Sequence, residues 1–259
     1  MHSTHVRRSP VRRLAGGLTL LAGMALAALP VPAAAGEFAQ VDLLGFSRSG
    51  SHFAFEEYGV QDGSGFPYSN IYVIDVGDDS WVPGTPLRRL DEVDDSQPLD
   101  FAEELARTRA ANREAARVVL DQTGIAGAGE TVAHNPATER SSDPHLMLAS
   151  VIPDVPSMGE TVTLALEERP VPDPDTCPSG FGDIRGMKLT LSFEGKTRIL
   201  ADDTQIPKSR GCPLRYRIER FVIHTPTFPG PTYFAVLVLM ERIGFEGPDG
   251  RFLAITGRL

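Results

Sequence analysis

The chain has 259 residues, of which 25 are basic and 34 acidic, so its formal net charge at neutral pH is −9. An acidic surface repels phosphate backbones and anionic lipid headgroups. This argues against a nucleic-acid-binding protein and against one that binds membranes by charge. The length suits one domain, or two small ones, with a substantial hydrophobic core.

The first 35 residues have the layout of a secretory signal peptide. Four arginines precede an uncharged apolar run at residues 14–29, which ends in prolines and a small-residue cleavage site at 33–35. An uncleaved anchor is the alternative, but the run is shorter than the ~20 residues a membrane-spanning helix needs. We expect cleavage to leave residues 36–259, with 21 basic and 34 acidic residues and a net charge of −13. The pair Arg12-Arg13 keeps both general secretory and twin-arginine export open.

Short strands are predicted in the first part of the mature chain. Alternation of apolar and other residues predicts strands at 39–46 and 52–58, with Phe53 and Phe55 on one face and Ala54 and Glu56 on the other. A β-branched and aromatic run predicts a third strand at 70–76. Glycines, a serine and a proline predict a loop before it, at residues 62–67.

One long helix is predicted at residues 97–123. The segment is rich in Ala, Glu, Arg and Leu and contains no glycine. Ser96 is a candidate cap, Pro98 suits the first turn, and Gly124 suits the end of the helix. Its apolar residues lie roughly on one face, which predicts packing on a sheet; they are Phe101, Leu105, Ala116, Val119 and Leu120.

The last hundred residues are again typical of strands. Glu194-Gly195 predicts a hairpin between strands at 187–193 and 196–200. The apolar run 233–240 is typical of a central strand that is buried on both faces.

These patterns predict a mainly β (α+β) fold of antiparallel sheets with one long helix between two strand-rich parts. We expect a single domain, 36–259, with lobes at 36–90 and 160–259 joined by the helix at 97–123. A β-propeller-like fold is the alternative, since strand–glycine turn–strand patterns near both ends of the mature chain resemble each other.

The two cysteines, Cys177 and Cys212, both lie in the mature chain. Two cysteines in an oxidising compartment usually pair, so we predict a disulfide, with free thiols as the alternative. No histidine or third cysteine stands at ligand spacing from them, which argues against a metal site.

Residues 45–50 (Gly-Phe-Ser-Arg-Ser-Gly), the apolar strand 53–55 and residues 71–75 (Ile-Tyr-Val-Ile-Asp) resemble a propeller-blade repeat of the TolB type. Arg48 and Ser49 stand where that repeat has proline and aspartate. Residues 53–72 and 81–86 are similar to a bacterial family of predicted secreted proteins, domain of unknown function 2259. That resemblance implies export. It implies no activity and supplies no catalytic residues.

Patterns that carry chemistry in other proteins are incomplete in this sequence. Residues 124–131 have the spacing of a phosphate-binding loop, but Glu130 stands where that loop needs a lysine. His134 and His145 flank Asp143 without the spacing of a zinc site, although they could serve a metal or a general base. We therefore predict no catalytic residue, no metal site and no cofactor.

The most unusual local segment is the loop at residues 58–68, which combines acidic, aromatic and glycine residues. Aromatic and polar side chains on a loop between strands suit contact with a ligand or partner. The candidate interaction residues are Tyr58, Asp62, Phe66 and Tyr68. The alternative is a hairpin loop whose aromatic rings pack back on the sheet.

The sequence favours a secreted or periplasmic, non-catalytic binding or envelope-interaction module that acts through this loop. Its partner would be a protein or small-molecule ligand of the cell envelope. We expect no nucleic-acid partner, and no membrane span after the signal peptide is removed. The alternative is a secreted hydrolase whose site assembles from distant residues such as His134 and His145. A purely structural envelope protein is a third hypothesis. Whether the protein is an enzyme stays open, with a non-enzyme favoured.

Overall fold

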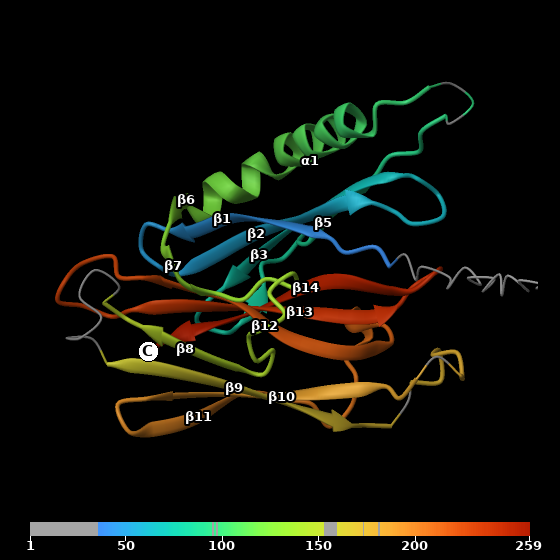
Figure 1. Ribbon diagram of the computed structural model, residues 1–259. Coiled ribbons are helices and arrows are strands. Elements are labelled where there is room, and N and C mark those ends of the chain that lie inside the picture. The colour runs from blue at the N-terminus through green and yellow to red at the C-terminus, as the bar shows by residue number, and fades with distance from the viewer. Residues whose placement is uncertain (1–35, 95, 97, 153–159, 173, 181) are drawn as a thin grey trace, which may run out of the picture. The chain divides into compact units, whose positions relative to one another are not determined.

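The computed structural model describes residues 36–94, 96, 98–152, 160–172, 174–180 and 182–259 (Figure 1). The predicted signal peptide, residues 1–35, lies outside the described residues. The described residues form three antiparallel sheets and one long helix, so the predicted mainly β fold with one helix is confirmed. No helix in the described part of the chain has the length and apolar character that crossing a membrane requires.

The first sheet contains the N-terminal strands and one strand that follows the helix. Its order is β4-β3-β2-β1-β6, with β5 also paired to β3. The strands are β1 (Gln40–Ser47), β2 (His52–Val60), β3 (Pro67–Asp75), β4 (Ser80–Trp81), β5 (Leu87–Leu90) and β6 (Ile125–Ala128).

The other two sheets contain four strands each and follow the helix in the chain. The middle sheet has the order β14-β13-β12-β7, and the third sheet has the order β11-β10-β9-β8. The middle strands are β7 (Glu130–His134), β12 (Pro213–His224), β13 (Tyr233–Ile243) and β14 (Pro248–Arg258). The third sheet contains β8 (Leu146–Ser150), β9 (Thr161–Pro170), β10 (Arg185–Phe193) and β11 (Lys196–Asp202), and a 3-10 turn, η1 (Lys208–Arg210), follows it.

The middle sheet is covered on both faces, which its central strand β13 shows most clearly. Side chains alternate across a strand, and those of Phe234, Val236 and Val238 join the core shared with the third sheet. Ala235 and Leu237 join the core shared with the first sheet. All five are fully buried. The prediction of a central strand buried on both faces is therefore confirmed.

The propeller alternative is wrong for the described residues. The first sheet contains the consecutive antiparallel strands β1 to β4, as a blade does, but the remaining strands form two further sheets stacked in layers (Figure 1). The glycine turns that resemble each other near the two ends of the chain mark antiparallel hairpins in different sheets. Such turns are common to antiparallel folds of many kinds and do not specify closure into blades.

Helix α1 (Phe101–Thr123) begins four residues later than the predicted start at residue 97. Asp100 caps it, because its side chain accepts hydrogen bonds from the backbone N–H groups of Ala102 and Glu103. Pro98 therefore precedes the cap, and Ser96 takes no part in it. Gly124 ends the helix in a left-handed conformation (φ 67°), as predicted.

The face that α1 turns to the first sheet (Figure 1) is more polar than its sequence predicts. Its buried residues are Thr108, Asn112 and Ala116, whereas Phe101 is 46% exposed. The reason lies in the sheet below, where Glu56 of β2 is fully buried and needs cationic partners. Helix α1 supplies these partners. A guanidinium nitrogen of Arg109 lies 3.0 Å from Glu56 Oε2, and one of Arg113 lies 2.6 Å from it.

Cys177 and Cys212 form a disulfide, as predicted, with their Cα atoms 5.7 Å apart. The bond joins the connection between β9 and β10 to the residue before β12. It therefore links the third sheet to the middle sheet. A cross-link over 35 residues contributes about 3–4 kcal/mol in the chain-entropy model.

Candidate functional site

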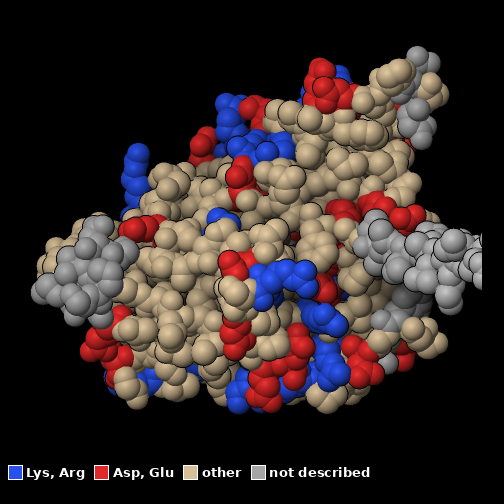
Figure 2. All heavy atoms as spheres, in the orientation of Figure 1, with Lys and Arg blue, Asp and Glu red and all other residues tan. Residues whose placement is uncertain are grey.

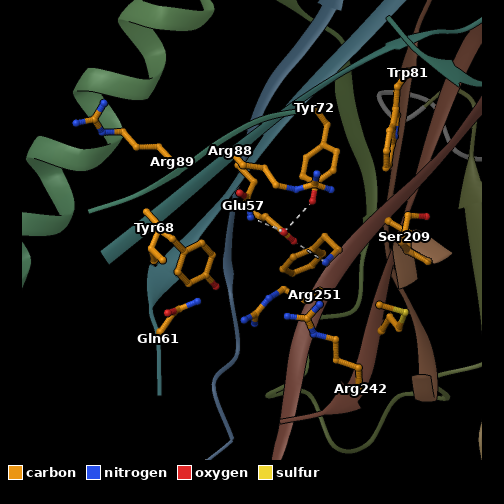
Figure 3. Close-up of a pocket in the computed structure, with 15 residues that line it drawn as sticks. Glu57, Gln61, Tyr68, Tyr72, Trp81, Arg88, Arg89, Ser209, Arg242 and Arg251 are labelled. Carbon is orange, nitrogen blue, oxygen red and sulfur yellow. Dashed lines mark hydrogen bonds between the residues drawn. The ribbon is translucent and has the colours of Figure 1, made fainter. Parts of the chain in front are cut away.

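A cavity of about 320 Å³ lies where β2, β3 and β5 of the first sheet meet β13 and β14 of the middle sheet (Figure 3). Its volume is at the lower end of the range typical of small-ligand sites. Arg88 and Arg89 of β5, Arg242 of β13 and Arg251 of β14 line it together with Trp81. We call it the arginine–tryptophan cavity.

Arginines reach this cavity from opposite sides. Figure 3 shows Arg88 entering from the first sheet and Arg242 and Arg251 from the middle sheet, whereas the side chain of Arg89 extends toward the helix. Three of the four have acidic partners within 4 Å. The pairs are Arg89 with Asp91 (2.8 Å), Arg242 with Asp249 (3.8 Å) and Arg251 with Glu37 (3.1 Å). Among the described residues Arg88 has no acidic partner.

Glu57 is the acidic residue of the cavity lining, and its carboxylate accepts hydrogen bonds from other groups of the chain. It is 2% exposed and accepts hydrogen bonds from Asn70 Nδ2 (3.0 Å), the Tyr72 hydroxyl (2.9 Å) and the backbone N–H of Phe252 (2.9 Å). Three donors stabilise a buried carboxylate without a direct ion pair. Glu57 therefore forms no ion pair with Arg88, whose guanidinium lies beside the hydroxyl of Tyr72.

Aromatic rings form one wall of the cavity. Trp81, the single tryptophan of the chain, is 43% exposed, and its ring centroid lies 5.9 Å from that of Tyr72. The guanidinium of Arg88 lies 5.9 Å from the centroid of Trp81. Burial raises the pKa of Tyr68 and of Tyr72 far above the usual phenol value, so both keep a neutral hydroxyl at physiological pH. The wall thus combines flat apolar faces with hydroxyl groups.

A second hollow of about 260 Å³ adjoins the first and shares Tyr72, Trp81 and Ser209 with it. Its other boundaries include Pro207, beside η1, and Ala254 of β14. The two hollows form one groove, which runs along β14 between the first sheet and the segment after β11.

The charge of this groove is local. On the face of the molecule shown in Figure 2, basic and acidic side chains are interspersed, and no field of one sign covers it. A mixed surface does not attract polyanions over long distances. The arginines of the cavity therefore suit a small anionic group rather than an extended polyanion.

The four residues of the predicted interaction loop lie in the β2–β3 hairpin but have different surroundings. Tyr68 is 4% exposed and lines the cavity, with the guanidinium of Arg251 5.1 Å from its ring centroid. Tyr58 lies under Arg109 of the helix, 3.4 Å from ring centroid to guanidinium. The backbone N–H of Asp62 donates to Glu37, and that of Phe66 donates to Ser64. Neither Asp62 nor Phe66 lines the cavity, but Gln61 of the same loop does.

The two candidate histidines each meet an acid but lie away from the cavity. His134 Nε2 is 2.7 Å from Glu219, and His145 Nε2 is 3.5 Å from Glu168. Within the described ranges neither side chain hydrogen-bonds a hydroxyl or thiol, and no group of three or more potential metal ligands forms. The structure does not assemble a nucleophile, a base and an acid around them, so the hydrolase hypothesis gains no support.

Sequence reasoning missed the arginines of the cavity and Trp81. No element was predicted between residue 76 and the helix, although Arg88 and Arg89 lie there on the short strand β5. A signal was present, because the single tryptophan and two adjacent arginines stand within nine residues. The distant arginines of β13 and β14 carry no such signal, since only sheet packing brings them to the site.

The fold and the site define a mainly β protein with three antiparallel sheets and an arginine- and tryptophan-lined cavity between two of them. Residues 54–258 match the model of a family described as predicted secreted protein (DUF2259), and the chain belongs to that family. No curated protein and no solved structure matches the chain. The family description agrees with the export that the N-terminal residues predict.

Proposed function

We propose that this protein is an exported, non-catalytic binding module, residues 36–259, which holds a ligand with a carboxylate or phosphate group in the arginine–tryptophan cavity. The observation that carries the proposal is the position of Arg88 in the cavity without an acidic partner. It is exposed, lies beside Trp81, enters the cavity and has no acidic partner among the described residues. A guanidinium with free donors binds carboxylate or phosphate oxygens in a bidentate manner.

The other arginines support this choice of ligand. Arg251 is 8% exposed and held by Glu37 and Asp249, so its position is fixed before any ligand arrives. Arg242 extends the positive side of the cavity. Binding groups that are already ordered lose little conformational entropy when a ligand binds.

The predicted interaction loop has a place in this proposal through Tyr68 and Gln61, which line the cavity. The hydroxyl of Tyr68 is buried beside the carboxylate of Glu37. Tyr58, Asp62 and Phe66 then support the loop without touching the ligand.

Trp81 makes a direct test available, because it is the single tryptophan and sits in the cavity wall. Citrate and inorganic phosphate are added to the mature protein at constant ionic strength while tryptophan fluorescence is recorded. We expect a saturable change for at least one anion. Arg88→Gln should weaken its binding about tenfold or more, since a charge-assisted hydrogen bond contributes about 1.5–3 kcal/mol.

The matched control is Arg117→Gln. Arg117 is an exposed arginine on α1 that pairs with Glu114 and does not line the cavity. It removes the same charge from the same chain, so it should leave the titration unchanged. Equal binding by the wild type and the Arg88 variant, or no saturable change with either anion, would contradict the proposal.

A further inference from the structure

Strand β14 is an edge of the middle sheet, and three of its outward backbone N–H groups are bonded to other parts of the chain. Gly250 donates to the carbonyl of Glu37 (2.7 Å). The N–H of Phe252 donates to Glu57 (2.9 Å), and that of Thr256 donates to Asp79 (2.7 Å). Covering an edge with inward-pointing acids is a known way to prevent unwanted strand pairing.

Ala254 stands between two of these covered positions. The β13–β14 register runs without a shift from Pro248 to Arg258. The backbone N–H and C=O groups of alternate residues of β14 therefore point away from β13. The backbone N–H groups of Phe252 and Thr256 point away from β13, and the N–H and C=O groups of Ala254 therefore do as well. Nothing in the described part of the chain bonds its outward N–H or C=O.

The free backbone of Ala254 opens into the second hollow, beside Trp81 and Ser209. Along a strand, two residues span roughly 7 Å, so Phe252 at the edge of the arginine–tryptophan cavity is one such step away. A single extended chain in the groove can therefore reach Ala254 with its backbone and the arginines with an acidic group.

We infer that the ligand of the groove is a short extended peptide with an acidic side chain or terminal carboxylate. Its backbone pairs with Ala254 and its carboxylate binds Arg88; this inference rests on the proposed function. Addition of a peptide strand to a sheet edge gains affinity from backbone hydrogen bonds. A peptide residue paired with Ala254 would form two such bonds, one with the N–H and one with the C=O of Ala254.

The covered flanks decide what kind of chain fits. Glu57 and Asp79 occupy the edge on either side, so a long strand from a second copy of the protein cannot pair along β14. An acidic polysaccharide could satisfy the arginines and stack on Trp81, but it has no amide pair to match the N–H and C=O of Ala254. The observations therefore favour a peptide over a second copy and over a polysaccharide.

The test uses the wild-type mature protein and Trp81 fluorescence. The probe is a pentapeptide of four alanines and a C-terminal aspartate, compared with single N-methyl versions at each internal position, with citrate and with trigalacturonate. We expect the peptide to bind about tenfold more tightly than citrate, because its backbone adds two hydrogen bonds to the contact with the arginines. N-methylation should weaken binding about tenfold at one position, and not at the positions next to it, because alternate amides of a strand point away from its partner.

Each other outcome is decisive. Citrate binding together with equal binding of all the N-methyl peptides overturns the inference and leaves the proposed function standing. Binding of trigalacturonate but not of the peptide does the same. A fluorescence change that depends only on protein concentration identifies a second copy as the occupant and also overturns the inference. No binding of any anionic probe overturns both proposals.

Discussion

Glu56 and Glu57 are neighbours on β2, but they lie on opposite faces of the first sheet and are stabilised in different ways. Both are buried, at 0% and 2% exposure. Glu56 faces α1 and is paired with Arg109 and Arg113. Glu57 faces the middle sheet and accepts hydrogen bonds from neutral donors, among them the hydroxyl of Tyr72.

The difference shows how one strand can support the helix on one face and line the proposed binding site on the other. On the helix side, two guanidinium groups are committed to a carboxylate and fasten α1 to the sheet. On the cavity side, neutral donors stabilise the carboxylate of Glu57. The guanidinium of Arg88 is then available for a ligand, and the predictions below test this contrast.

The largest expected effect is on the helix side. Replacing both Arg109 and Arg113 by alanine leaves the fully buried carboxylate of Glu56 without a cation. Removing the partners of a buried charge costs about 3–5 kcal/mol of unfolding free energy. Urea unfolding measures the loss, and Arg117→Ala on the exposed side of the same helix is the control. A loss below about 1 kcal/mol would mean that solvent or other groups stabilise Glu56.

Alkaline pH should destabilise the cavity side through Tyr72. Burial raises the pKa of Tyr72 above the usual value near 10, so in the unfolded chain the phenol ionises at lower pH than in the folded protein. The stability that the neutral phenol contributes is complete below pH ~10 and decreases as pH rises above it. Urea unfolding between pH 8 and 11 should therefore show a smaller decrease for Tyr72→Phe than for the wild type. Parallel decreases would contradict this.

A smaller loss is expected for Glu57→Gln. Glutamine keeps the size of the side chain and one acceptor oxygen, but it presents an amide to donors such as Asn70 Nδ2 and the N–H of Phe252. One buried donor without a partner costs about 1–3 kcal/mol. We expect a decrease of about 1–2 kcal/mol in urea unfolding. If Glu57→Gln lowered the free energy of unfolding as much as the double arginine variant does, the two faces of β2 would not differ in the way described.

The smallest effect on stability is expected for Arg88→Gln. Because Arg88 has no acidic partner in the described part of the chain and is exposed, its charge contributes little to folding. We expect a change within about 0.5 kcal/mol, typical of surface substitutions, together with loss of anion binding. Marked destabilisation by this variant would indicate that Arg88 supports the fold instead of a ligand.

Much of the fold could be predicted from local patterns. The alternation around Phe53 and Phe55 identified the two faces of β2, and the unbroken apolar run of β13 indicated a strand between two cores. The start of α1 was misplaced because Ser96 and Asp100 are both good caps. Only the structure shows that the side chain of Asp100 bonds the first free N–H groups.

The candidate site could be predicted only in part. Tyr68 was identified from its loop and does line the cavity. Arg88 and Arg251 are separated by more than 160 residues of sequence and line one cavity because sheet packing brings β5 and β14 together. No local spacing encodes such a meeting. The free edge at Ala254 also depends on the hydrogen bonds that Phe252 and Thr256 donate to Glu57 of β2 and to Asp79 of the β3–β4 turn.

The central claim is that Arg88 and Trp81 form an anion site, and the indole N–H signal of Trp81 tests it most directly. A chain with a single tryptophan gives one indole signal in a ¹H–¹⁵N correlation spectrum. The account predicts that citrate or phosphate, added at constant ionic strength, shifts this signal to saturation in the wild type and in Arg117→Gln, but not in Arg88→Gln. A signal that stays in place in the wild type, or that moves equally in all three proteins, would contradict the account.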